Sequence, residues 1–63
     1  MKERTLTYDG KVVGSMVNAG GKALVADPNG VYVGTYRNGV FRGRSGIELT
    51  ISPEEVLYRM QNG

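Results

Sequence analysis

The stretch TYRNGVFRGRSG, residues 35–46, is centred on the dipeptide Asn38-Gly39 and decides how the middle of the chain folds. Asn-Gly between two runs that contain apolar residues is a strong local signal for a two-residue type I′ turn, because both turn positions need a positive φ angle. The stretch therefore predicts a β-hairpin with Gly39 in its turn. A two-residue loop also fixes the register, which starts with Arg37 opposite Val40.

This register gives the hairpin two different faces, because successive side chains on a strand point to opposite sides. The first face carries aromatic side chains around a facing pair of glycines: Tyr32, Tyr36, Phe41, Gly34 and Gly43. The second face carries small or apolar side chains and three arginines: Val33, Thr35, Val40, Arg37, Arg42 and Arg44. We expect the aromatic face to lie on the core, where the glycines make room for a closely packed element such as a helix. We expect the arginine face to be solvated.

Further turn signals divide the rest of the chain into short strands. Asp9-Gly10 predicts a second type I′ hairpin, and Asp27-Pro28-Asn29-Gly30 has turn residues at every position. The apolar or alternating runs between the turns predict six antiparallel strands, at about residues 4–8, 11–17, 22–27, 31–37, 40–44 and 47–51. We expect the last of these to be half-buried, because its apolar residues alternate with polar ones.

The C-terminal segment carries several helix-start signals that agree with one another. Ser52 is a good N-cap, Pro53 stands at the first helical position, and Glu55 completes a capping box three residues after Ser52. Ile51 and Val56 occupy the positions of a hydrophobic staple. We predict one short helix at about residues 53–61, packed on the sheet.

These elements predict a single small domain over residues 1–63 of the mainly β class. It is a meander of about six short antiparallel strands, forming a small barrel or a flower-like sheet, with one short C-terminal α-helix. A chain of 63 residues has room for no more than one such domain, and its margin of stability is thin.

The composition removes most catalytic chemistry. The chain has no cysteine and no histidine, so it lacks disulfides, the strongest nucleophile, the commonest general base and the usual zinc ligands. Its serines have no neighbouring base, and no two carboxylates are placed to face each other. Gly20-Gly21-Lys22 leads into a strand and not into a helix, which does not fit a phosphate-binding loop. We therefore predict no enzymatic activity, no metal site and no cofactor.

Charge and hydropathy favour a soluble protein. The net charge is +2 and the isoelectric point is about 9.2, which is compatible with nucleic-acid binding without indicating it. The first 20 residues contain no apolar run of signal-peptide length, and no run in the chain is long enough to span a membrane. We expect a cytoplasmic location and no membrane partner.

The chain also repeats a short pattern of turn residue, glycine and apolar residues. Residues 9–15 match residues 29–35, and residues 45–50 form a fainter copy. Through ADPNGVYVGTYRNGVFRGRSG, residues 26–46, the chain resembles the β-flower-type small bacterial proteins, whose glycine-punctuated hairpin units are arranged radially. This resemblance covers about residues 8–46 and implies no known chemistry, and the C-terminal helix departs from the pattern.

A second, weaker resemblance is to MORN repeats. Tyr32, Gly34, Tyr36, Gly39 and Gly43 have the spacing of one such unit, although no second full unit exists. A real MORN unit would imply a scaffold that contacts a membrane or a protein.

Two function classes remain. Residues 12–17 and 31–36 of the predicted strands are apolar on both faces, whereas one helix covers only one face, so the other face closes into a barrel or meets a partner. We therefore predict a non-enzymatic protein-binding or regulatory module, of the inhibitor or adaptor type, that covers a partner's surface and forms a homo-oligomer. The candidate interface residues are Val12, Met16, Val31 and Val33. The alternative is a small β-barrel that binds nucleic-acid phosphates through Arg37, Arg42 and Arg44.

Overall fold

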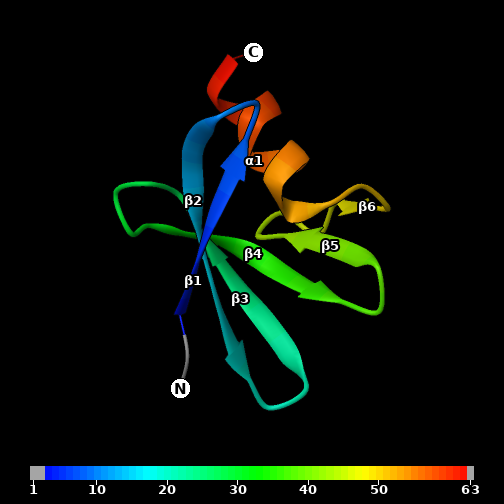
Figure 1. The fold of residues 1–63 in the computed structure, drawn as a ribbon. Helices are drawn as coiled ribbons and strands as arrows, with labels where there is room; N and C mark the ends of the chain where they lie inside the picture. The colour runs from blue at the N-terminus through cyan, green and yellow to red at the C-terminus, as the bar shows by residue number, and fades with distance from the viewer. Residues whose placement is uncertain (1–2, 63) are drawn as a thin grey trace.

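The computed structural model describes residues 3–62, which form one sheet of six antiparallel strands followed by one helix (Figure 1). The elements are β1 (Glu3–Tyr8), β2 (Lys11–Ala19), β3 (Lys22–Ala26), β4 (Tyr32–Arg37), β5 (Val40–Gly43), β6 (Glu48–Leu49) and α1 (Pro53–Asn62). The strands pair in chain order from β1 to β6, and these two edge strands do not pair with each other. The predicted mainly β meander with a C-terminal helix is confirmed, and its sheet is open and not a closed barrel.

Both predicted type I′ hairpins are present. Asp9 and Gly10 have φ angles of 55° and 77°, and Asn38 and Gly39 have φ angles of 52° and 81°. The β4–β5 register is the predicted one, with Arg37 opposite Val40 and the glycine pair facing each other. The ladder ends at Gly43, so the predicted strand does not extend to residue 44.

Two irregularities break the strict alternation that the sequence suggested. Between β1 and β2 the pairing passes from Val12 to Gly14, so that Val13 is an extra residue. Between β3 and β4 it passes from Tyr32 to Gly34, so that Val33 is extra. Such a bulge shifts the facing of the side chains on one side of it.

The bulges correct two predictions. Val12 and Met16 were proposed as parts of one interface, and strict alternation along the strand would place both on one face. They lie on opposite faces, because Val13 intervenes and turns its own side chain into the core. Val33 was expected on the arginine face, but it is half-buried and packs against the core cluster. In both places the extra residue is a valine, and the free energy gained by burying its side chain offsets the loss of regular strand pairing.

The core lies between the helix and one face of the sheet. It consists of six buried side chains, contributed by β1, β2, β3, β5 and α1: Leu6, Val13, Val25, Phe41, Val56 and Leu57. The helix packs across β1 and β2 (Figure 1). Gly14 is needed there, because a Cβ at that position would overlap the backbone carbonyl of Ala26 and would also lie 2.7 Å from Leu57 Cδ1.

The glycine pair of the opening hairpin has a different role from the expected one. A Cβ on Gly34 would lie 2.6 Å from Phe41 Cζ and would also meet the Arg42 backbone carbonyl. The space above Gly34 is therefore filled by the ring of Phe41 and not by the helix. A side chain on β5 can cover this gap because it lies diagonally across the same face of the sheet.

The helix begins as predicted. Ser52 Oγ accepts a hydrogen bond from the Glu55 backbone N–H at 3.3 Å, which is the N-cap contact, and Ile51 and Val56 both pack on the core. The Glu55 carboxylate accepts a hydrogen bond from Arg59 at 2.6 Å, one turn further along, and the structure shows no bond from it to the Ser52 backbone. The reciprocal half of the predicted capping box is thus replaced by an ion pair within the helix.

Two contacts hold the far part of the helix against the first hairpin. Gln61 Nε2 donates a hydrogen bond to the Val13 carbonyl at 2.8 Å. The rings of Tyr8 and Tyr58 lie 4.6 Å apart between their centroids. The helix is therefore fixed over β1 and β2.

The predicted strand at 47–51 is present but shorter and more exposed than predicted. Only Glu48 and Leu49 pair with β5, and Ile47 and Leu49 are exposed instead of half-buried. A tight turn precedes the strand, in which the Gly46 N–H donates to the Gly43 carbonyl. The chain then leaves the sheet to reach the N-cap of a helix that covers β1 and β2, so that β6 stays uncovered.

Candidate functional site

An apolar groove lies between α1 and the part of the sheet formed by β4, β5 and β6. Its volume is about 410 Å³. Three of the residues that line it, Val33, Phe41 and Val56, belong to the core or pack against it. Five further apolar side chains line it and are exposed: Val31, Tyr32, Ile47, Leu49 and Met60.

The exposed apolar side chains are concentrated at this groove. Among residues 3–62 six large hydrophobic side chains are exposed, and all except Val12 line the groove. The five are between 37% and 58% exposed, so together, inside the groove and around its rim, they present roughly a few hundred Å² of apolar surface. Patches of this size on small proteins often mark a binding site, whereas scattered single hydrophobic residues do not.

The turn before β4 places Val31 and Tyr32. Asp27 Oδ1 accepts hydrogen bonds from the backbone N–H groups of Asn29 and Val31, each at 2.9 Å. The Asp27 N–H in turn donates to the Val31 carbonyl at 2.9 Å. The turn predicted from Asp-Pro-Asn-Gly is therefore closed by its own aspartate, which fixes the chain direction at the entrance of the groove.

The opposite wall comes from the turn after β5 and from the helix. The Gly43 N–H donates to the Ile47 carbonyl at 2.8 Å, so that Ile47 is held directly across from the end of β5. Met60 lies one helical turn after Val56 and therefore on the same face of the helix. Val56 reaches the core, whereas Met60 stays 56% exposed above it.

Among residues 3–62, a single charged side chain lines the groove. This is Arg44, which follows the last residue of β5, and no carboxylate from the described part of the chain lines the groove. The ion pairs found among residues 3–62 join Arg42 to Glu48 and Arg59 to Glu55. Arg44 takes part in neither of them.

The free edge of the sheet adjoins the groove at Leu49. Gly43 and Ile47 are joined by a backbone hydrogen bond, and Phe41 opposes Leu49 two residues further along. Because bonded and non-bonded pairs alternate in an antiparallel ladder, Glu48 between them directs its backbone N–H and C=O away from β5. β6 is the last strand of the sheet in the described part of the chain, so these groups lie on an open edge.

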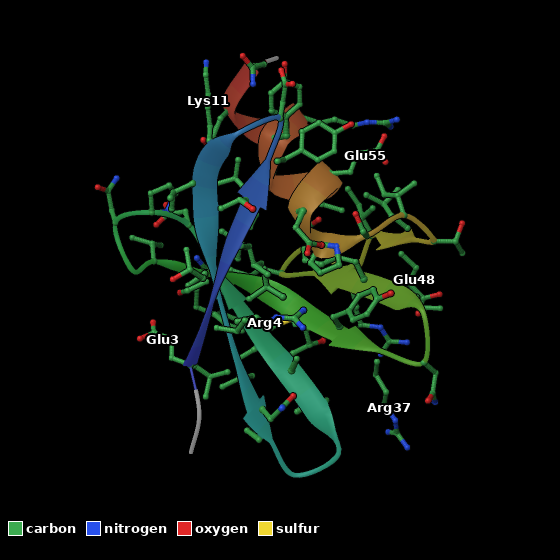
Figure 2. The ribbon with its side chains drawn as sticks, viewed as in Figure 1. Glu3, Arg4, Lys11, Arg37, Glu48 and Glu55 are labelled. Atoms are coloured by element: carbon green, nitrogen blue, oxygen red, sulfur yellow. The ribbon has the colours of Figure 1, made fainter. Side chains whose placement is uncertain are left out.

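The structure separates the three arginines proposed for nucleic acid. Arg37 and Arg42 line one depression of about 460 Å³ together with Lys22 and Glu48. Arg37 projects outward from the turn end of the β4–β5 hairpin (Figure 2). Arg42 is engaged by the Glu48 carboxylate, and Arg44 lies at the apolar groove instead. Only two of the three arginines therefore share the expected surface, and one of these two has an acidic partner.

The four residues proposed for a protein interface do not form one surface. Val31 and Val33 line the groove, although Val33 is half-buried. Val12 lies on the face opposite the helix, and Met16 packs against the core on the helix side. Sequence reasoning missed four interface candidates, because it assigned the first three to strands that face the core and the last to the helix packed on the sheet: Tyr32, Ile47, Leu49 and Met60.

The described residues offer no second kind of site. No three Asp or Glu side chains gather within residues 3–62 in a way that could hold a metal ion. In the same part of the chain, no helix has the length and apolar character needed to cross a membrane.

Comparison of the chain with models of protein families, with curated protein sequences and with solved structures found no match. The resemblances to β-flower proteins and to a MORN unit therefore stay predictions.

Proposed function

We propose that this protein is a non-enzymatic protein-binding module, of the inhibitor or adaptor type, whose apolar groove receives side chains of a partner protein. One observation carries the proposal: five of the six exposed large hydrophobic side chains among residues 3–62 line the same groove. Leaving these side chains in water gains nothing for the fold, and their burial by a partner is favourable.

The size of the surface fits a protein partner. A standard interface buries about 800 Å² on each side, with an apolar centre and a polar rim. The groove and the five exposed apolar side chains that line it are suited to be the apolar centre of such an interface, which a polar rim would complete. The backbone N–H and C=O of Glu48 at the adjoining edge are groups that another polypeptide backbone can bind.

Nucleic-acid binding is less well supported. Arg42 already has the Glu48 carboxylate beside it, and Arg44 is set among apolar side chains. Arg37 and Lys22 remain as exposed cations in the basic depression. Two cations give at most a weak site that salt abolishes readily.

The experiment compares two β-branched residues that are about equally exposed and lie on opposite faces of the sheet. Ile47 is 58% exposed in the groove and Val12 is 57% exposed on the face opposite the helix, so Val12→Glu is a matched control for Ile47→Glu. Random peptides displayed on phage are selected on the wild-type protein, and the Kd of each enriched peptide is measured by fluorescence anisotropy. Met60→Glu provides a second groove variant on a different element, and circular dichroism confirms that every variant is folded.

The expected magnitude follows from the exposure of Ile47. Full burial of such a side chain is worth about 1.5–3 kcal/mol, so the 58% still exposed is worth about 0.9–1.7 kcal/mol, or about 4- to 20-fold in Kd. Burying the new carboxylate adds to this loss. We expect Ile47→Glu and Met60→Glu to weaken binding at least to this extent and Val12→Glu to leave Kd within about two-fold. Enriched peptides that bind all three variants equally well, or no enriched peptides, would contradict the proposal.

A further inference from the structure

We infer that the groove recognises an acidic segment of its partner, in which two apolar side chains enter the groove and an aspartate or glutamate pairs with Arg44. This inference rests on the proposed function and adds the chemistry of the partner. It is carried by the charge of the groove, by its volume and by the open edge beside it.

The charge of the groove comes from Arg44, whose surroundings differ from those of the paired arginines. Arg42 and Arg59 each have a carboxylate within reach in the described part of the chain, and Arg44 lies among apolar side chains with no carboxylate on the wall. A partner that covers the groove removes water from around this guanidinium, and the loss of hydration is repaid only by a group that accepts its hydrogen bonds. A carboxylate does this best, because it can accept two parallel bonds from one guanidinium.

The same charge argues against a second copy of this chain in the groove. A symmetric dimer brings the same patch of both copies together, so two Arg44 side chains would enter one interface. Among the described residues that line the groove, no carboxylate is available to separate them. Like charges in one interface disfavour the pairing, whereas a different chain with an acidic residue satisfies Arg44.

The volume sets how much of the partner enters. A cavity of about 150 Å³ lined by apolar side chains holds one benzene ring. The groove, at about 410 Å³, therefore has room for two to three side chains of that size. The open edge at Glu48 begins beside Leu49, so a partner segment in extended form can bind this backbone while its side chains reach the groove.

The test uses two arginines that differ in their surroundings. Arg44 lines the groove and Arg37 projects from the far end of the hairpin, and both are exposed, so Arg37→Gln is the control for Arg44→Gln. The probes are the synthetic peptides obtained from the phage selection on the wild-type protein. Their Kd values for wild type, Arg44→Gln, Arg44→Glu and Arg37→Gln are measured by fluorescence anisotropy at low and at physiological salt.

We expect the enriched peptides to contain an Asp or Glu close to two apolar residues. Arg44→Gln weakens their binding about ten-fold, Arg44→Glu weakens it further, and Arg37→Gln changes it by less than about two-fold. A peptide in which the acidic residue is replaced by lysine regains affinity for the Arg44→Glu protein. This reversal of charge preference is a readout that a merely structural effect of the substitution would not produce.

The failure of this inference is distinguishable from the failure of the proposed function. The enriched peptides could bind Ile47→Glu more weakly, contain no preferred Asp or Glu, and bind Arg44→Gln with an unchanged Kd. That result would overturn the inference and leave the proposed function standing. Peptides that ignore Ile47→Glu would overturn both. A wild-type dimer in sedimentation velocity that Ile47→Glu converts to a monomer would show that a second copy is the occupant, and would also overturn the inference.

Discussion

The packing of α1 on the first hairpin leads to a quantitative prediction for Leu57→Ala. Leu57 is 1% exposed, and its Cδ1 lies directly over Gly14. Leu→Ala substitutions in a core cost about 2–5 kcal/mol, and the cost is largest where neighbours cannot move into the cavity. Gly14 has no side chain to move, so we expect a loss of about 3–4 kcal/mol.

This loss is large for a chain of 63 residues, whose total stability is about 3–9 kcal/mol by the usual value per residue. The melting temperature should fall by about 12–32 °C, since a domain of this size loses about 4–8 °C per kcal/mol. Urea unfolding followed by circular dichroism measures the free energy directly. If the variant is unfolded in buffer, Leu57→Met, which conserves volume and should cost less than about 1.5 kcal/mol, supplies a folded comparison.

The control for this prediction is Met60→Ala on the same helix. Met60 is 56% exposed, so its truncation should cost well under about 1 kcal/mol. Equal losses for the two variants, or a loss below about 1 kcal/mol for Leu57→Ala, would show that the helix does not seat on β1 and β2 through Leu57. The position of α1, which forms one wall of the groove, would then not be fixed by Leu57.

Two further substitutions test local features of the fold by the same urea unfolding. Ser52→Ala removes the acceptor of the Glu55 N–H bond and should cost about 1 kcal/mol; an unchanged free energy would mean that the cap is not formed. Gly34→Ala places a methyl group against the ring of Phe41 and should cost about 1–3 kcal/mol. Gly43→Ala, whose Cβ would meet the same ring at an ordinary 3.6 Å, should cost much less, and the reverse order would refute the reasoning.

Elements specified by a few adjacent residues could be predicted from the sequence. Asp9-Gly10 and Asn38-Gly39 each set two positive φ angles, which fixed both hairpins and their registers near the turns. Ser52 and Pro53 likewise set the start of the helix within one residue. These signals act over two to four residues and need no information from elsewhere in the chain.

The bulges at Val13 and Val33 could not be predicted in this way. Each depends on how far the neighbouring strand continues in register and on whether the core has room for one more valine. Strict alternation from the turn therefore assigned Val33 to the wrong face. It also placed Met16 on the same face as Val12, although the two lie on opposite faces. The error begins where the ladder breaks and leaves the residues between turn and bulge correct.

The groove was missed for a related reason. The alternation of Ile47, Leu49 and Ile51 with polar residues is typical of a half-buried strand, and nothing in those five residues tells where the helix will lie. The helix is drawn to β1 and β2 by Leu57 over Gly14 and by Gln61 on Val13, so Ile47 and Leu49 remain uncovered. The site arises from the distance between the last strand and the helix, which is a property of the whole fold.

The most direct test of the central claim is to map where a partner touches the protein. An enriched peptide is titrated into isotope-labelled protein, and the backbone amide signals are followed by nuclear magnetic resonance. We predict that the largest shifts fall around the groove, on Val31, Tyr32, Ile47, Leu49 and Met60, with little change at Val12 and Arg37. Shifts centred on Arg37 and Lys22, or on Val12, with the groove signals unmoved, would show that the protein binds through a different surface and would contradict the account.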